Sequence, residues 1–253
     1  MKKKTASGLT ERATVAGWNR YWRLRMLYHR YEVSGFENLD QDRSCLIAGY
    51  HGRPTAFDLC MLSVKVHERW GYLPHGIVHE SFDRVPILGP MFRNLGFVVG
   101  DGDGIREAVR RKEHIITAPG GTREAYRSYK TRYRIDWGDH YGYVRLALKY
   151  RMPVIPVAAS GVDDVFIGIN DGYRLGKKLK MPLKAPCWFA FGATGLWPLT
   201  LPLPAKIRQV IGKPLDPKRF GIKGPNDLEK IAKFHKRVVG EIQTMMARAR
   251  RLS

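Results

Sequence analysis

Cysteine, acidic residues and long apolar runs are all scarce in this chain of 253 residues. The three cysteines, Cys45, Cys60 and Cys187, are odd in number and widely spaced, which excludes a disulfide scaffold and a zinc ribbon and favours a reducing compartment. The uncharged segment 185–205 is the longest candidate for a spanning helix, but its four prolines would break one. No apolar run follows the basic first residues as in a secretory signal. We therefore expect a chain that does not cross a membrane.

The shortage of acids leaves a large excess of positive charge. Lysine and arginine number 44 against 23 aspartates and glutamates, for a net charge of +21. Such a chain is attracted to polyanions, whether nucleic acid, anionic lipid headgroups or phosphorylated substrates. Hydrophobic residues make up 44% of the sequence, enough to fill a core, which excludes a disordered chain.

The segment 11–31 predicts an amphipathic helix with two apolar faces separated by arginines. A helix rich in Trp, Tyr and Arg is suited to the lipid headgroup layer, so residues 1–31 are a candidate anchor at a membrane surface. A helix docked wholly on the rest of the protein is the alternative. The expected faces are Val15, Trp18, Trp22 and Met26 on one side, and Tyr21, Leu24, Leu27, Tyr28 and Tyr31 on the other.

Beyond this helix, short apolar strands alternate with helices, without an internal repeat or a long linker. The pattern predicts an α/β fold in which helices flank one central mixed sheet, as a single domain over 32–253. We expect strands at 31–36, 44–50, 76–79, 96–100, 114–118, 153–159 and a late pair at 187–193 and 207–211, with helices at 57–70, within 81–95, at 105–111, at 141–150 and after Pro225.

His51 follows a predicted strand, and Asp58 opens the next predicted helix. A carboxylate that accepts the N–H of an imidazole leaves the other ring nitrogen free to take a proton. The pattern therefore makes this pair a candidate base with its orienting acid. An ordinary loop histidine and a helix-capping aspartate are the alternative reading.

A second strand leads directly into Gly120 and Gly121, followed by Thr122, Arg123 and Glu124. Adjacent glycines let backbone N–H groups approach an anion, and an arginine can grip a phosphate or carboxylate. These five residues are candidate substrate-binding residues. An ordinary turn with Arg123 paired to a carboxylate is equally consistent with the sequence.

Taken in order, these blocks resemble the glycerolipid (lysophospholipid) acyltransferase superfamily, and the diacylglycerol-acyltransferase-like branch in particular. The resemblance rests on His51…Asp58, on 96–101, on 118–124 and on 152–157, and it covers roughly residues 32–215. Three details depart from the usual pattern. The His–Asp spacing is two residues longer, the arginine expected after the second block is absent, and Gly120 replaces the glutamate of the third.

The resemblance implies direct acyl transfer from acyl-CoA or acyl carrier protein to a hydroxyl of a lipid acceptor, without metal or cofactor. His51 would act as general base and Asp58 would orient it, while the turn at 120–124 would hold a polar part of a substrate. It also implies a peripheral position on the cytoplasmic face of a membrane. The apolar segment 187–204 would serve mainly as core.

Two alternatives remain open at this stage. One is a catalytically inactive lipid-binding protein of the same fold, which the longer His–Asp spacing favours. The other is a nucleic-acid-binding protein, which the charge favours, although the sequence carries no recognisable DNA- or RNA-reading motif and we expect no nucleic acid partner.

Overall fold

The computed structural model describes residues 2–78, 86, 88–100, 102–182 and 185–251. Within them, seven strands form a main sheet with the spatial order β1-β10-β6-β2-β5-β3-β4, and a small second sheet has the order β7-β8-β9. The main sheet is parallel except that β10 runs antiparallel to β6. The strands are β1 (Glu32–Ser34), β2 (Leu46–Gly49), β3 (His75–Val78), β4 (Val98–Val99), β5 (Ile115–Thr117), β6 (Val154–Ser160), β7 (Ile167–Gly168), β8 (Ala190–Gly192), β9 (Gly195–Leu196) and β10 (Arg208–Ile211).

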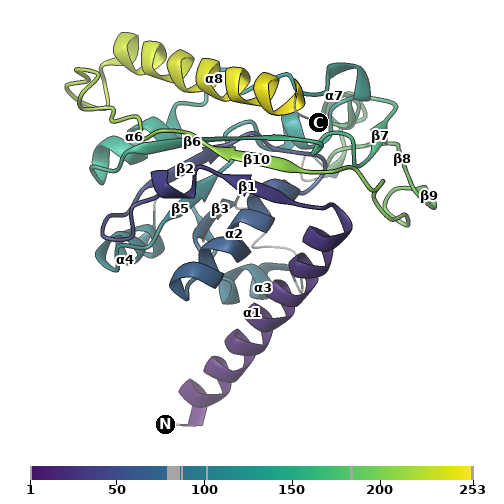
Figure 1. Cartoon of the computed structure of the whole chain (residues 1–253), viewed down its shortest axis with the longest axis horizontal. Helices are drawn as coiled ribbons and strands as arrows, with labels where there is room; N and C mark the ends of the chain where they lie inside the picture. Colours follow the sequence, from purple (N-terminus) through teal and green to yellow (C-terminus); the bar gives the residue numbers. More distant parts are fainter. Residues whose placement is uncertain (1, 79–85, 87, 101, 183–184, 252–253) are drawn as a thin grey trace.

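Helices cover both faces of the main sheet, as Figure 1 shows with α8 on one side and α2 on the other. The predicted mixed α/β architecture is therefore confirmed. The α-helices are α1 (Lys2–Tyr28), α2 (Phe57–Trp70), α3 (Leu88–Asn94), α4 (Asp103–Arg110), α5 (Gly121–Ala125), α6 (Gly142–Lys149), α7 (Gly172–Lys178) and α8 (Leu228–Arg251).

The core follows from the alternation of side chains along the strands. In β2, Ile47 packs in the cluster that contains Leu62 and Val66 of α2. The neighbouring Leu46 and Ala48 point to the opposite face and belong to the cluster that contains the apolar residues of α6 and α8. The central strands β2 and β6 are buried on both faces, and accordingly their residues are apolar except for Ser160 at the end of β6.

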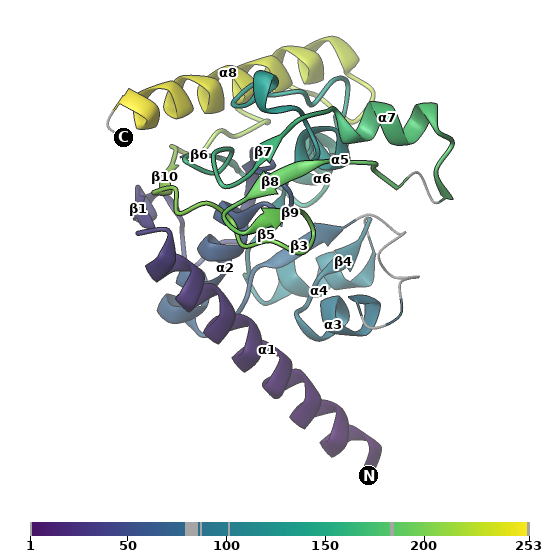
Figure 2. The same ribbon diagram turned by 90° about the vertical axis from the view of Figure 1, so that its right-hand side faces the viewer.

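The helix α1 lies against the sheet domain with its C-terminal half and extends away from it with its N-terminal half (Figures 1 and 2). Trp22 and Met26 are buried, and the Trp18 indole donates to Ser63 Oγ at 3.2 Å. Tyr21, Leu24, Leu27 and Tyr28 of the second predicted face are exposed. The helix runs from Lys2 to Tyr28 rather than over 11–31, so Tyr31 lies beyond it, partly buried, where its hydroxyl donates to Gln209.

Most predicted elements form close to the expected residues, and α2 has the predicted bounds. Gly71 ends it in the left-handed conformation, at φ 81°. The expected late pair of strands is not a pair, because β8 joins the small sheet whereas β10 joins the main sheet between β1 and β6. The proline-rich segment 198–204 separates them. Part of the predicted 81–95 region lies outside the described residues.

Candidate functional site

Three adjacent parallel strands bring the site residues to one edge of the sheet. β6, β2 and β5 lie side by side, and their C-terminal ends are followed by Asp163, His51 and Glu124, respectively. Ligands of open α/β sheets bind outside the carboxyl ends of the strands. The topology therefore places two of the residues singled out in the sequence, His51 and Glu124, at the edge where a substrate site is expected.

The half-buried ring of His51 is oriented by a backbone carbonyl. Its Nδ1 lies 3.0 Å from the oxygen of Gly52. A carbonyl oxygen only accepts, so Nδ1 is assigned the proton and Nε2 is the basic nitrogen. Burial lowers the pKa of His51 to about 4, against the opposing effect of the hydrogen bond to Gly52. The ring is therefore neutral at physiological pH and able to accept a proton.

Gly52 is held in place from two directions. Its carbonyl also accepts the N–H of Ala56 at 2.9 Å, which closes the loop between β2 and α2. A Cβ added at Gly52 would lie 2.0 Å from Cγ2 of Val162. Only glycine therefore fits at this position, and the carbonyl that orients His51 is fixed by the packing of the loop.

Glu124 supports His51 from the neighbouring strand. Its Oε2 accepts the backbone N–H of His51 at 3.0 Å, and its Oε1 accepts the N–H of Asp136 at 2.8 Å. The carboxylate is fully buried, and burial raises its pKa to about 7 although these donors and Arg127 lower it. It also folds against Gly120, where a Cβ would lie 2.1 Å from its Cδ. Glu124 thus holds the backbone of His51, which corrects the expectation that it meets substrate directly.

A buried charged network lies behind His51, and the sequence did not predict it. Arg127 donates to the carbonyl of His51 at 3.2 Å and to the hydroxyl of Tyr50, which in turn donates to Asp163. Arg53 donates to the carbonyl of Asp163. All four network residues are buried. Tyr50 and Arg53 flank His51, whereas Arg127 and Asp163 lie far from them in the sequence and meet them only in the fold, so pattern analysis gives no signal for the network.

Asp58 lies in the first turn of α2 and is fully buried. Neither of its carboxylate oxygens has a hydrogen-bond partner among the described residues. Burial raises its pKa to about 8, against the effect of the amides of Leu59 and Asp58 itself. The expected Asp58–His51 hydrogen bond is therefore not formed, because the Nδ1 proton of His51 is already taken by Gly52.

The turn at 120–124 is a short helix rather than an open loop, since α5 begins at Gly121. Gly121 has a φ of 48°, which requires glycine or strain. The side chain of Thr122 is exposed. Arg123 is 36% exposed and donates to Asp136 at 2.8 Å. These two polar side chains of the turn are accessible from solvent.

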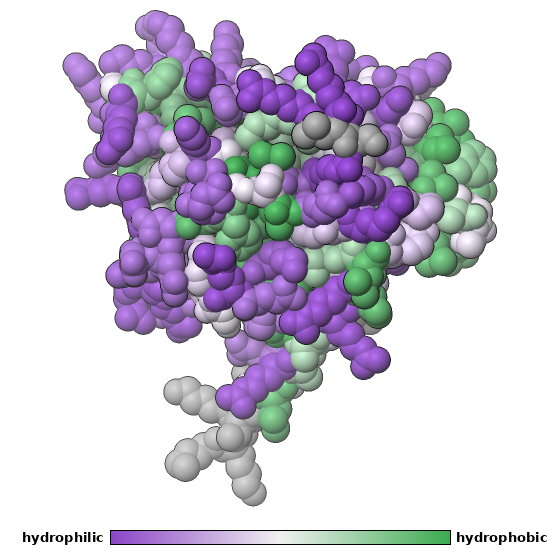
Figure 3. All heavy atoms as spheres, viewed as in Figure 1, coloured by the Kyte–Doolittle hydropathy of each residue, from purple (hydrophilic) through white to green (hydrophobic). Residues whose placement is uncertain are grey.

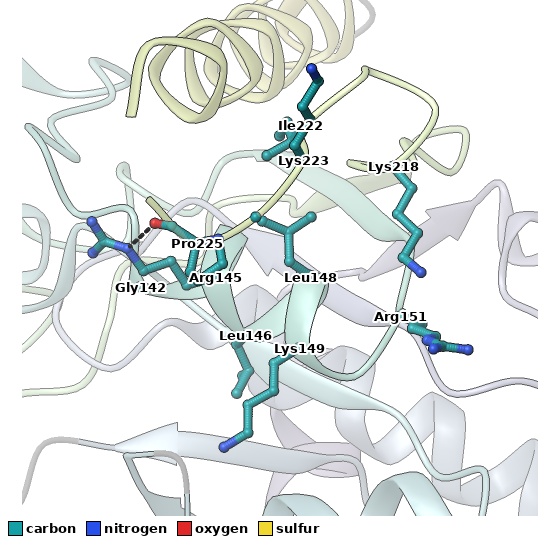
Figure 4. Close-up of a pocket in the computed structure, with 11 residues that line it drawn as sticks. Gly142, Arg145, Leu146, Leu148, Lys149, Arg151, Lys218, Ile222, Lys223 and Pro225 are labelled. Atoms are coloured by element: carbon teal, nitrogen blue, oxygen red, sulfur yellow. Dashed lines mark hydrogen bonds between the residues drawn. The ribbon is translucent and has the colours of Figure 1, made fainter. Parts of the chain in front are cut away.

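A cavity lies away from these residues. Its volume is about 700 Å³, and five cationic side chains line it (Figure 4). It is formed by α6, the loop that precedes β6 and the segment before α8, which places it at the N-terminal edge of the sheet. In the register of β2 with β6, Arg151 comes before the first paired residues and His51 after the last, so the cavity and His51 lie at opposite ends of these strands. Its cationic residues are Arg145, Lys149, Arg151, Lys218 and Lys223.

The two other sequence blocks, 152–157 and 96–101, form strands of the main sheet and a turn. The 152–157 block forms the start of β6, and the 96–101 block forms β4 and the following turn, with Asp101 outside the described residues.

In the described part of the chain, no group of His, Cys, Asp or Glu is arranged to hold a metal ion. None of the helices described combines the length and apolar character needed to cross a membrane.

Curated relatives share part of this chain. An uncharacterized protein of Mycobacterium tuberculosis strain H37Rv is 26% identical to this chain over 197 residues. The match covers 74% of this chain and 52% of that protein. The human "DGAT1/2-independent enzyme synthesizing storage lipids" is 26% identical over 227 residues, which is 87% of this chain and 66% of the human protein. The chain thus spans about half to two thirds of the length of these relatives.

The fold has a counterpart among solved structures. The 1-acyl-sn-glycerophosphate (LPA) acyltransferase PlsC of Thermotoga maritima superposes with a TM-score of 0.51 and 18% identity, covering 95% of this chain and 83% of that one. A family model described as Acyltransferase matches residues 30–160, slightly more than half of the chain, and this range contains β2, β5 and β6 together with His51, Asp58 and Glu124. The chain therefore belongs to the acyltransferase family.

Proposed function

We propose that this protein transfers a fatty acyl group from a thioester donor, acyl-CoA or acyl carrier protein, to a hydroxyl of a lipid acceptor at a membrane surface. The observation that carries the proposal is the orientation of His51, whose Nδ1 faces the Gly52 carbonyl while its Nε2 is left as the base. Family membership supplies the reaction class.

In the proposed mechanism, Nε2 of His51 removes the proton of the acceptor hydroxyl as its oxygen attacks the thioester carbonyl carbon. The tetrahedral intermediate collapses by breaking the carbon–sulfur bond, and the imidazolium returns its proton to the departing thiolate. The products are an ester and a free thiol. No acyl-enzyme forms, and the reaction as proposed needs no cofactor or metal.

Other residues are proposed to position the base or the substrates. Glu124 and Arg127 hold the backbone of His51 through its N–H and its carbonyl, respectively. Thr122 and Arg123 are proposed to contact a polar part of a substrate, with Gly120 and Gly121 shaping the turn. We assign no proton transfer to Asp58, since its carboxyl group makes no hydrogen bond to the ring among the described residues.

Acyl transfer by the purified protein tests this proposal, with labelled acyl-CoA and acyl carrier protein as donors and a panel of lipid alcohols as acceptors. We expect His51→Ala to lower kcat/KM by about 10²-fold or more, in line with loss of a general base. His67→Ala, on the outer part of α2, should change it less than twofold.

The pH profile gives a second readout. A base with a pKa near 4 is unprotonated above that pH, so kcat/KM should fall only as the pH drops toward 4 and should stay level between pH 5 and 7. Full turnover by His51→Ala would contradict the proposed base.

A catalytically inactive lipid-binding protein of the same fold is the second candidate. The observation that favours it is the unpartnered carboxyl group of Asp58. In that case, neither donor would support turnover with any acceptor, while the wild type and His51→Ala would bind lipid equally well.

A further inference from the structure

A group of large apolar side chains is exposed on one side of the molecule. They belong to the small sheet and to the segment that follows it, and Figure 3 shows apolar surface over β8 and β9 at the right-hand side. Leu199 is 92% exposed and Leu196 is 54% exposed. A contiguous patch of exposed apolar side chains indicates an interaction site, whereas apolar side chains scattered singly over a surface do not. We call this surface the β8–β9 face, and its members are Ile169, Phe189, Phe191, Leu196, Leu199 and Leu201.

The sequence led us to expect this segment mainly as core, and the structure divides it differently. Trp188 and Ala190 point inward and are buried, whereas Phe189 and Phe191 point outward, as alternation along a strand requires. The core therefore contains the side chains on one side of the strand, whereas the apolar side chains on its other side are exposed to solvent.

The C-terminal end of α1 adjoins this face. The hydroxyl of Tyr28 donates to the carbonyl of Pro202 at 2.7 Å, and Arg30 donates to the carbonyl of Pro204 at 3.3 Å. Leu24 and Leu27 are 60% and 77% exposed on the adjoining part of the helix. The exposed face of α1 and the β8–β9 face thus meet at the segment 202–204.

The charge around this face is complementary to an anionic surface. Residues 185–205 carry no charge, and α7, whose last turn contains Lys177 and Lys178, lies on the same side of the molecule as the small sheet (Figure 2). Arg30 lies at the border with α1. An apolar centre with cations near its border fits an interface of acyl chains and anionic headgroups. A second copy of a chain with a net charge of +21 would instead be repelled.

A short chain of contacts joins the β8–β9 face to the catalytic edge. Arg127, which holds the carbonyl of His51, has its own carbonyl bonded to the Trp188 indole at 3.2 Å. The Trp188 ring packs on Trp197 at 5.6 Å, next to Leu196 of β9. One layer of aromatic side chains therefore separates the candidate base from this face.

We propose that the β8–β9 face, together with Leu24 and Leu27 of α1, docks on an anionic lipid bilayer and so presents the His51 edge to acceptors held in the membrane. This deepens the proposed function and rests on it for the acceptor, but the docking itself is measurable without any turnover. It also assigns membrane contact to a β-structure as well as to the first helix.

Vesicle flotation of the full chain tests the proposal, with phosphatidylcholine vesicles that contain 30% phosphatidylglycerol or none. The double variant Leu196→Asp with Leu199→Asp removes two exposed apolar side chains and adds charge, so its partition coefficient should fall about tenfold or more. Leu228→Asp is the matched control, since Leu228 is 55% exposed at the start of α8, and its binding should match the wild type. Circular dichroism and sedimentation velocity establish the fold and the oligomeric state of each variant.

The outcomes separate docking from catalysis. Equal binding by the double variant and the wild type, no binding of the wild type to anionic vesicles, or wild-type self-association that the double variant abolishes would each overturn the docking proposal. Activity is assayed in parallel on a short-chain acceptor free in solution. If the wild type shows no turnover of this soluble acceptor, the proposed function is refuted. The flotation result does not depend on that outcome.

Discussion

At the scale of single residues, the candidate base is positioned through the backbone rather than by a side-chain acid. Its ring hydrogen bonds to the Gly52 carbonyl, its N–H to Glu124 and its own carbonyl to Arg127. A carbonyl carries no full charge, so it fixes the tautomer of the imidazole without strongly raising the pKa. Burial lowers the pKa of His51 to about 4, so the histidine stays neutral within a network of arginines and carboxylates.

Asp58 offers a prediction at this scale, because its pKa is raised from an ordinary value near 4 to about 8. Between these values the folded protein holds a proton that the unfolded chain has released, so stability falls as the pH rises through this window. We expect Asp58→Asn to become more stable than the wild type by roughly 1 kcal/mol per pH unit between pH 5 and 8. Urea unfolding at pH 5, 6.5 and 8 measures the difference.

Asp42→Asn, which removes a carboxyl group at an exposed position, serves as the control for Asp58→Asn. A constant difference for Asp58→Asn would show that the buried carboxyl group does not titrate in this window. The turnover of Asp58→Asn should also fall far less than that of His51→Ala.

At the scale of elements, the site depends on the docking of α5 beside the end of β2. The close approach of Glu124 to Gly120 lets the carboxylate turn back toward the His51 amide. The helix is only five residues long, so the side chain, rather than the helix itself, provides the connection between the two strands.

Gly120→Ala tests that connection. The added methyl group would meet Glu124 Cδ at 2.1 Å and force the carboxylate away from the N–H groups of His51 and Asp136. We expect kcat to fall at least tenfold, since a misplacement of about 1 Å costs roughly this much or more. Gly142→Ala in α6, where nothing lies within 4 Å, should leave kcat unchanged. Equal activity of the two variants would exclude the positioning role of Glu124.

The comparison of sequence and structure is also clearest for elements. The periodicity of 57–70 predicted α2 with its observed bounds, and the apolar runs predicted β2, β5 and β6, because burial on one or both faces leaves a local pattern. The short elements α5, α7, β7 and β9 have too few residues for a period. His51 was found because it ends a strand, whereas Arg53, Arg127 and Asp163 meet only through the tertiary fold.

At the scale of the whole molecule, two opposite regions have different characters. The His51 edge lies near the small sheet, whereas the basic cavity lies by α6 at the other end of the main sheet (Figure 1). The β8–β9 face is uncharged at its centre, and the cavity is lined by five cations. The positive charge of the chain therefore reaches well beyond the side that we propose meets the bilayer.

Charge reversal in the cavity tests this polarity. In the double variant Arg151→Glu with Lys218→Glu, both changed residues line the cavity, at the end of the main sheet opposite to His51. We expect turnover on a soluble acceptor and the vesicle partition coefficient in 0.15 M salt to change less than threefold, since exposed charges separated by more than a Debye length of about 8 Å are largely screened from each other. Flotation and a kinetic assay on the same preparation measure both. A tenfold loss of vesicle binding would place the cavity at the lipid interface instead.

The hydrogen bond from the backbone N–H of His51 to Glu124 allows the opening of the site to be measured by hydrogen exchange. That amide proton belongs to no ladder between strands and is shielded by a carboxylate from another segment. Its exchange with deuterated water therefore requires α5 to separate from the end of β2. Deuterium uptake at this one position would then record how often the site comes apart, in a protein that is not turning over.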